Sequence, residues 1–258
     1  MRATAPTYQL NDSRIINGWA FFDWANSAYA LVITVAIFPG YFDTVVDSTV
    51  QIGGLELQSS SLYAYAIAFS FLVTAILSPL LSGIADYGGR KKFFLRLFTT
   101  IGACACMSLY FFEGMTELWL GIGASVVASI GFAGGIVFYN SYLPEIVTED
   151  LYDRVSARGF IFGFIGSVLL LLVNLVMIQQ PAWFGLPDAG MAARVSFLMV
   201  GVWWLGWSLI PFKRLPADQP IRTQESLVKK GFEELHKVWN KLKKLSNTRR
   251  FLIAFFFL

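Results

Sequence analysis

Asp23 is the residue whose position points most directly to chemistry. It stands within residues 18–29, about two helical turns inside a long apolar stretch. A carboxylate at that depth of a membrane is costly to bury alone, so it is expected to face a polar cavity or a partner. A substrate amine, a cation or a proton would suit it. The alternative is a structural role, in which Asp23 stays wet or anchors neighbouring helix ends.

Small polar residues accompany Asp23 on one predicted helix face. Asn26, Ser27 and Thr34 follow it at helical spacing, and such residues suit the lining of a solute path. Tyr139 and Asn140 lie in a later apolar segment, toward the same inner side of the membrane, and could join the cluster. The predicted substrate- or ion-binding set is Asp23, Asn26, Ser27, Thr34, Tyr139 and Asn140.

Two further rows of small residues have close helix packing as their first explanation. One is the row Ser70, Thr74, Ser78 and Ser82, which a binding site would also explain. The other is the glycine row Gly159, Gly163 and Gly166. Small residues let two helix backbones approach closely inside a membrane.

Catalytic and metal chemistry find little support. The chain has one histidine, His236, and it lies outside the apolar segments, so no histidine-based metal or acid–base pair is expected inside a membrane. The G-x-x-x-x-G-K-[ST] phosphate loop does not occur. We therefore predict no enzyme activity, no catalytic residue, no metal and no cofactor.

The elements that must position these residues are membrane helices. Of the 258 residues, 56% are hydrophobic and only 14% are charged, against about 25% charged in soluble domains. Apolar segments of about 20 residues cross a bilayer as helices. Six are present, near residues 17–42, 60–84, 93–112, 118–142, 158–179 and 193–212. The predicted fold class is an all-α membrane protein, a six-helix bundle in the lipid bilayer.

Basic residues predict the orientation. With a cytoplasmic N-terminus, 19 of the 20 lysines and arginines lie on the inner side, and only Arg194 lies outside. Short cytoplasmic loops collect such residues. Residues 213–249 are strongly basic and carry apolar residues at three- and four-residue steps, which predicts an amphipathic helix on the inner membrane surface. A calmodulin-type target or a nucleic-acid patch is the alternative, but the flanking spans explain the pattern without such a partner.

The loop between the second and third segments carries the most specific motif. An acid, Asp86, is followed by two glycines that end at Gly89, and then by a basic group that begins with Arg90 and Lys91. This pattern makes a charged, tightly turned hinge. It resembles the signature G-x-L-A-D-x-x-G-R-[KR] of the major facilitator superfamily. Ser82 and Tyr87 depart from the pattern, where a glycine and a basic residue are usual.

Three motifs, in the same order along the chain, indicate one branch of this superfamily. Residues 23–29, 84–87 and 139–145 together resemble the branch that includes the fungal vacuolar amino-acid effluxers of autophagy, and the resemblance covers residues 15–258. It implies the N-terminal half of a twelve-helix secondary transporter of a small solute, with amino acids favoured, in a bacterial inner membrane. It also implies that Asp86, Gly89, Arg90 and Lys91 form a conformational gate.

The implied organisation has three parts and a missing partner. Residues 1–212 would form the six-helix bundle, 213–249 the cytoplasmic linker, and 250–258 the truncated start of a seventh helix. A C-terminal six-helix half would complete the central cavity. Two alternatives stay open: a membrane scaffold or assembly subunit that transports nothing, and a natural short chain that pairs with a separate second half.

Overall fold

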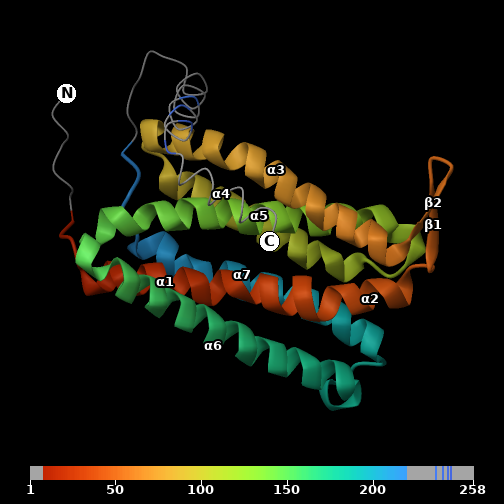
Figure 1. Ribbon diagram of the computed structural model, residues 1–258. Helices are drawn as coiled ribbons and strands as arrows, with labels where there is room; N and C mark the ends of the chain where they lie inside the picture. Colours follow the sequence, from red (N-terminus) through yellow and green to blue (C-terminus); the bar gives the residue numbers. More distant parts are fainter. Residues whose placement is uncertain (1–7, 220–235, 237–239, 241–242, 244, 246–258) are drawn as a thin grey trace.

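The computed structural model describes residues 8–219 and the single residues 236, 240, 243 and 245. Within this part, six helices are long and apolar enough to cross a membrane, which confirms the predicted all-α six-helix bundle (Figure 1). The predicted linker beyond residue 219 lies outside the described residues, apart from those single positions. So does the predicted seventh helix, 250–258.

The first span is longer than predicted and is not α-helical throughout. It consists of α1 (Ser13–Ala28), a π-helical segment η1 (Tyr29–Ile37) and α2 (Phe38–Val45). Asp12 caps its start, because its carboxylate accepts a 2.7 Å hydrogen bond from the Arg14 N–H. In the π-helical segment the backbone winds more widely than in an α-helix, and the Phe38 N–H donates to the carbonyl of Ile33, five residues back.

The remaining spans are α3 (Ser59–Gly88), α4 (Lys91–Ser108), α5 (Leu118–Ile146), α6 (Tyr152–Gln179) and α7 (Ala189–Arg214). Four short 3₁₀ turns occur in the connections: η2 (Leu109–Phe111), η3 (Met115–Glu117), η4 (Glu149–Leu151) and η5 (Pro181–Phe184). Most helices extend beyond the predicted apolar segments because polar end turns are helical too, whereas α4 ends at Ser108, before the predicted limit at residue 112.

One feature of the fold was not predicted, a β-hairpin between the first and second spans. β1 (Thr49–Ile52) pairs antiparallel with β2 (Leu55–Gln58), with Ile52 opposite Leu55. Gly53 and Gly54 form the two-residue turn with φ values of 58° and 84°, which glycine adopts without steric cost. The hairpin lies at the opposite end of the bundle from the α3–α4 turn (Figure 1).

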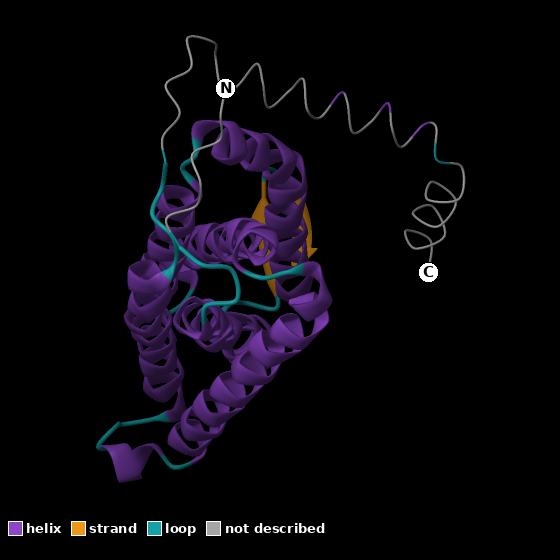
Figure 2. Cartoon of the chain, turned by 90° about the vertical axis from the view of Figure 1, so that its left-hand side faces the viewer, coloured by secondary structure: helices purple, strands orange, loops and turns teal. Residues whose placement is uncertain are grey.

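Helix α1 packs against α6 and α7, while α4 packs against α5 and α7, and α3 lies along α5. Figure 2 looks onto the end at which α1 begins and α7 ends. Buried hydrophobic residues form two clusters, one around Phe38 and Phe197 and the other around Trp19 and Phe138. The second cluster surrounds the segment of α1 that carries Asp23.

Candidate functional site

A short hydrogen bond joins Asp23 of α1 to Tyr139 of α5. The Tyr139 hydroxyl donates to Asp23 Oδ2 at 2.6 Å. The Tyr139 ring is sandwiched by aromatic neighbours, with centroid distances of 4.2 Å to Trp19 and 4.8 Å to Phe22. The Trp19 Nε1–H also donates to the backbone carbonyl of Tyr139 at 3.0 Å. These contacts hold the phenol in one orientation, so its hydroxyl is available to the carboxylate.

Glycines of α6 make room for this pair. A Cβ on Gly159 would lie 2.6 Å from Asp23 Oδ2 and 2.7 Å from the Tyr139 hydroxyl oxygen. A Cβ on Gly163 would lie 2.6 Å from Ser27 Oγ. All three distances are too short for a side chain at either position. The glycine row therefore packs α6 against the polar face of α1, as its spacing predicts.

An open pocket of about 400 Å³ begins at the Asp23–Tyr139 pair. Its walls come from three helices: α1, α5 and α6. The lining residues are Trp19, Asp23, Ile136, Tyr139, Asn140, Ser156, Ala157 and Phe160. A carboxylate, an amide and two hydroxyls thus share one hollow with aromatic and aliphatic walls. This combination suits a small solute that carries a polar or positively charged group.

A second hollow of about 270 Å³ lies further along the same side of α1. Ser27 lines it together with Ala30, Leu31, Val35, Phe160, Phe164 and Ser167. Phe160 is 73% exposed and contributes to both hollows. Ser27 therefore lies beside the Asp23 pocket rather than in it.

Asn26 and Thr34 do not line either hollow. Asn26 is only 1% exposed and faces the interior between α4 and α5. Thr34 lies in the π-helical segment, and its carbonyl accepts a 3.4 Å hydrogen bond from the Tyr63 hydroxyl. The expected common face assumed a uniform 3.6-residue turn. The wider π-helical winding after Ala28 rotates Thr34 out of that register.

The residues of the predicted gate lie at the turn between α3 and α4. Gly89 has a φ of 58°, which fits the predicted tight reversal. Arg90 is exposed, and Lys91 Nζ donates to Glu145 Oε1 at the end of α5 at 2.7 Å. The Asp86 backbone is helical, and its side chain lies outside the described part of the chain.

Asp218 is a residue that the sequence did not single out. Its carboxylate accepts hydrogen bonds from the backbone N–H groups of Lys92 at 2.7 Å and Phe93 at 2.9 Å. It therefore caps α4 from a segment more than 120 residues away. Lys92 Nζ in turn donates to the carbonyl of Leu215 at 2.7 Å. The start of the predicted linker is thus hydrogen-bonded to the first turn of α4.

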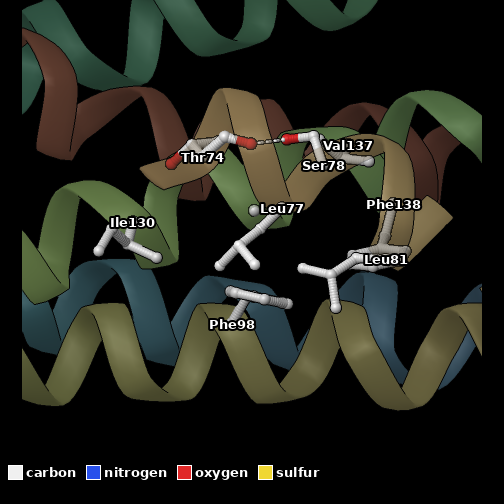
Figure 3. A pocket seen from close by; sticks show the side chains of 9 residues that line it. Thr74, Leu77, Ser78, Leu81, Phe98, Ile130, Val137 and Phe138 are labelled. Carbon is white, nitrogen blue, oxygen red and sulfur yellow. Dashed lines mark hydrogen bonds between the residues drawn. The ribbon is translucent and has the colours of Figure 1, made fainter. Parts of the chain in front are cut away.

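The hydroxyl row of α3 bonds within its own helix. Ser70, Thr74 and Ser78 donate to the carbonyls of Ile67, Ser70 and Thr74 at 2.7, 2.9 and 2.6 Å. Figure 3 shows the Thr74–Ser78 turn above a cavity of only about 10 Å³, whose other walls are apolar. The row therefore fits the packing explanation better than a solute site.

Metal binding has no structural support in the part of the chain that is described. No group of three histidine, cysteine, aspartate or glutamate side chains there could hold a metal ion. The two cysteines, Cys104 and Cys106, are free.

Comparison with known proteins gives a consistent set of relatives. The family model "Vacuole effluxer Atg22 like" matches residues 11–258. The uncharacterized MFS-type transporter YxiO of Bacillus subtilis is 32% identical over 243 residues, which cover 93% of this chain and 56% of YxiO. Autophagy-related protein 22 of Coccidioides immitis is 31% identical over 210 residues, 60% of this chain and 34% of that protein.

A yeast protein with the same name is also similar to this chain. Autophagy-related protein 22 of Saccharomyces cerevisiae S288c is 26% identical over 192 residues, 67% of this chain and 35% of that protein. The chain spans about half the length of YxiO and about a third of the fungal proteins. No solved structure matches it.

Proposed function

The chain belongs to the family of proteins like the vacuole effluxer Atg22, and from this premise we propose that it is the N-terminal half of a secondary transporter that moves a small solute by alternating access. Its relatives are named as transporters and effluxers, and its six apolar helices mark an integral membrane protein. The single observation that carries the proposed mechanism is the Asp23–Tyr139 pair at the mouth of an open pocket.

The pocket chemistry favours a solute with an ammonium group. The Asp23 carboxylate supplies a negative charge, while the exposed ring of Phe160 supplies an aromatic surface that attracts a cation. Asn140 and Ser156 add neutral donors and acceptors on the other walls. Amino acids have the required amine, and they are the solute class that the family resemblance favours. Ser27 would contact the solute from the adjoining hollow.

Asp23 is also the proposed site of proton coupling. Among the carboxylates of the described spans it lies deepest, about ten residues inside its helix, whereas Asp43, Glu145 and Asp153 lie near helix ends. A carboxylate with a hydroxyl partner can alternate between a charged and a protonated form as its access to water changes. Proton binding there would couple solute movement to a pH gradient.

The missing wall of the pocket would come from a second six-helix half. In this proposal residues 1–212 are the first bundle, 213–249 an amphipathic linker on the membrane, and 250–258 the beginning of a seventh helix. The 56% coverage of YxiO supports a longer complete protein. The gate residues Asp86, Gly89, Arg90 and Lys91 would hold the inner side closed, with Glu145 as the α5 partner of Lys91.

The proposed setting is a bacterial inner membrane with the N-terminus in the cytoplasm. The concentration of basic residues in the loops on one side supports this orientation.

Transport by the reconstituted full-length protein tests the proposal. Liposomes with an imposed pH gradient should accumulate amino acids when they carry the wild-type protein, and Asp23→Asn should abolish the dependence on the gradient. Gradient-driven uptake that is unchanged in Asp23→Asn would overturn the role of Asp23. Absence of any solute flux from folded wild-type protein would instead favour a scaffold.

A further inference from the structure

An open groove of about 600 Å³ lies between α6 and α7 on the surface of the bundle. Its lining side chains are all apolar or aromatic, and they include Leu170, Leu198, Met199, Val202, Trp203 and Trp207. The stretch of α7 from Leu198 to Trp207 is about 14 Å long. The hydrocarbon of one bilayer leaflet is about 15 Å deep, half of the membrane core. The groove therefore has the length and the surface that suit one acyl chain.

Aromatic side chains of α1 join α6 to α7 at the Trp207 end of the groove. The centre of the Phe21 ring lies 5.5 Å from that of Phe162 on α6 and 6.0 Å from that of Trp207 on α7. Trp24 stacks on Trp203 at 5.4 Å, and the Trp203 Nε1–H donates to the carbonyl of Trp24 at 3.1 Å. These contacts hold both tryptophan rings of the groove in place.

Two arginines flank this aromatic cluster, toward the end of α7. The guanidinium carbon of Arg158 lies 5.7 Å from the centre of the Phe162 ring. Arg214 packs beside Gly18, one turn before Phe21, where a Cβ on the glycine would lie 2.6 Å from Arg214 Cβ. Both arginines are exposed, and neither forms an ion pair with a carboxylate in the described part of the chain. Two positive charges thus lie beside one end of an apolar groove.

The described residues that follow α7 lie against α4 instead of the groove. The carbonyl of Leu215 accepts a hydrogen bond from Lys92 Nζ at 2.7 Å. The Asp218 carboxylate accepts from the N–H groups of Lys92 and Phe93. No described residue beyond Trp207 lines the groove. The described start of the predicted linker is therefore not its occupant.

An anionic phospholipid fits both the groove and the two charges. Guanidinium groups bind phosphate through charge-assisted hydrogen bonds, and basic pockets between membrane helices bind acidic headgroups. Arg214 lies two turns beyond Trp207, about 10 Å closer to the end of α7, where a headgroup would sit above its acyl chains. A zwitterionic phospholipid has the same chains, but the arginines repel its ammonium group.

We propose that the α6–α7 groove is a binding site for an anionic phospholipid. One acyl chain lies along Trp203 and Trp207, and the phosphate lies between Arg158 and Arg214. The site requires only that the bundle lies in a membrane. It is separate from the Asp23 pocket, whose lining shares no residue with the groove.

Lipid titration followed by native mass spectrometry tests the site without any transport measurement. The full-length protein in detergent is titrated with phosphatidylglycerol or with phosphatidylcholine that carries identical acyl chains. The first phosphatidylglycerol should bind about tenfold more tightly than the first phosphatidylcholine, because each nearby basic residue attracts an anionic headgroup. Arg158→Gln combined with Arg214→Gln should abolish this preference. Glutamine retains the side-chain carbons of Arg214 that pack on Gly18, so the fold should be kept.

Arg90→Gln is the control for charge. It removes an exposed charge at the turn between α3 and α4, and it should leave the preference for phosphatidylglycerol unchanged. Equal affinity of the wild type for the two lipids would overturn the proposal. A preference that survives the loss of both Arg158 and Arg214 would overturn it as well.

A second pair of variants locates the acyl chain. Val202 is 56% exposed and lines the groove, whereas Leu172 of α6 is 55% exposed and does not line it. Val202→Trp should fill part of the groove and weaken phosphatidylglycerol binding several-fold. Leu172→Trp adds the same ring to the surface and should leave binding unchanged. Equal phosphatidylglycerol affinity of these two variants would contradict a chain in the groove.

Discussion

Tyr139 and Asp23 form a hydrogen-bonded pair that joins two different helices, with 2.6 Å between the phenol oxygen and Oδ2. The pair is built by its neighbours: Trp19 and Phe22 orient the phenol, and Gly159 leaves the space for the carboxylate. Because an open pocket begins at this pair, the same two groups are positioned both to hold α1 against α5 and to meet a solute.

Tyr139→Phe should weaken both the contact between α1 and α5 and the binding of solute. The variant keeps the ring stacking and loses the hydrogen bond to the carboxylate, which is worth about 1.5–3 kcal/mol when one partner is charged. We expect a lower thermal midpoint and weaker solute binding, measured by thermal shift with and without amino acids. Tyr65→Phe on the exposed face of α3 is the matched control. A thermal midpoint and solute affinity equal to those of the wild type would show that the bond contributes nothing.

Gly159→Ala should damage the site through steric contact alone. The new methyl group would lie 2.6 Å from Asp23 Oδ2, so either α6 or the carboxylate must move, at a cost of about 1–3 kcal/mol. We expect transport to fall by about tenfold or more, because a displacement of this size misplaces a binding group. Gly206→Ala on α7, where nothing lies within 4 Å, should retain wild-type transport. Equal activity of the two variants would contradict the close α1–α6 packing.

Asp218→Ala should loosen the start of α4. Loss of a helix cap costs about 1 kcal/mol, and the N–H groups of Lys92 and Phe93 would lose their acceptor. Hydrogen–deuterium exchange of peptides that cover residues 91–95 should therefore become faster. Asp218→Asn retains one side-chain oxygen and should give an intermediate rate. Identical exchange in all three proteins would refute the cap.

Reversing the charge of Glu145, and then that of Lys91, should change how readily the proposed gate opens. Their ion pair is partly exposed, so it contributes up to about 1 kcal/mol, or about a fivefold change in the open population. In a Cys104→Ser background, a cysteine at Ser156 would report access to the pocket. Glu145→Lys should raise the rate at which a water-soluble thiol reagent labels this cysteine. The second substitution, Lys91→Glu, should return that rate to the wild-type value. A labelling rate that neither substitution changes would show that the Lys91–Glu145 pair does not contribute to the gate.

The sequence was sufficient to predict the span architecture because long apolar runs have few solutions other than membrane helices. It also associated Asp23 with Tyr139 and Asn140, since helix topology places those residues at a similar depth. Thr34 was predicted to share the face of Asp23, but it lines neither hollow beside that face. A π-helical segment changes the residues per turn without a distinctive residue pattern, so its face could not be predicted from α-helical spacing.

Contacts between residues far apart in the sequence could not be predicted either. The Asp218 cap and the Lys91–Glu145 pair join residues 126 and 54 positions apart, and nothing in their local sequence indicates the partner. The hairpin at residues 49–58 had a local signal, two glycines between short runs with alternating polarity. Each run is only four residues long, too short to stand out as an apolar segment.

The most direct test of the central claim is gradient-driven solute uptake by the reconstituted full-length protein with and without Asp23. With Asp23→Asn, we expect uptake that no longer responds to a pH gradient, while Asp43→Asn near the end of α2 retains the wild-type response. A folded Asp23→Asn protein that accumulates solute with the same gradient dependence as the wild type would contradict the account.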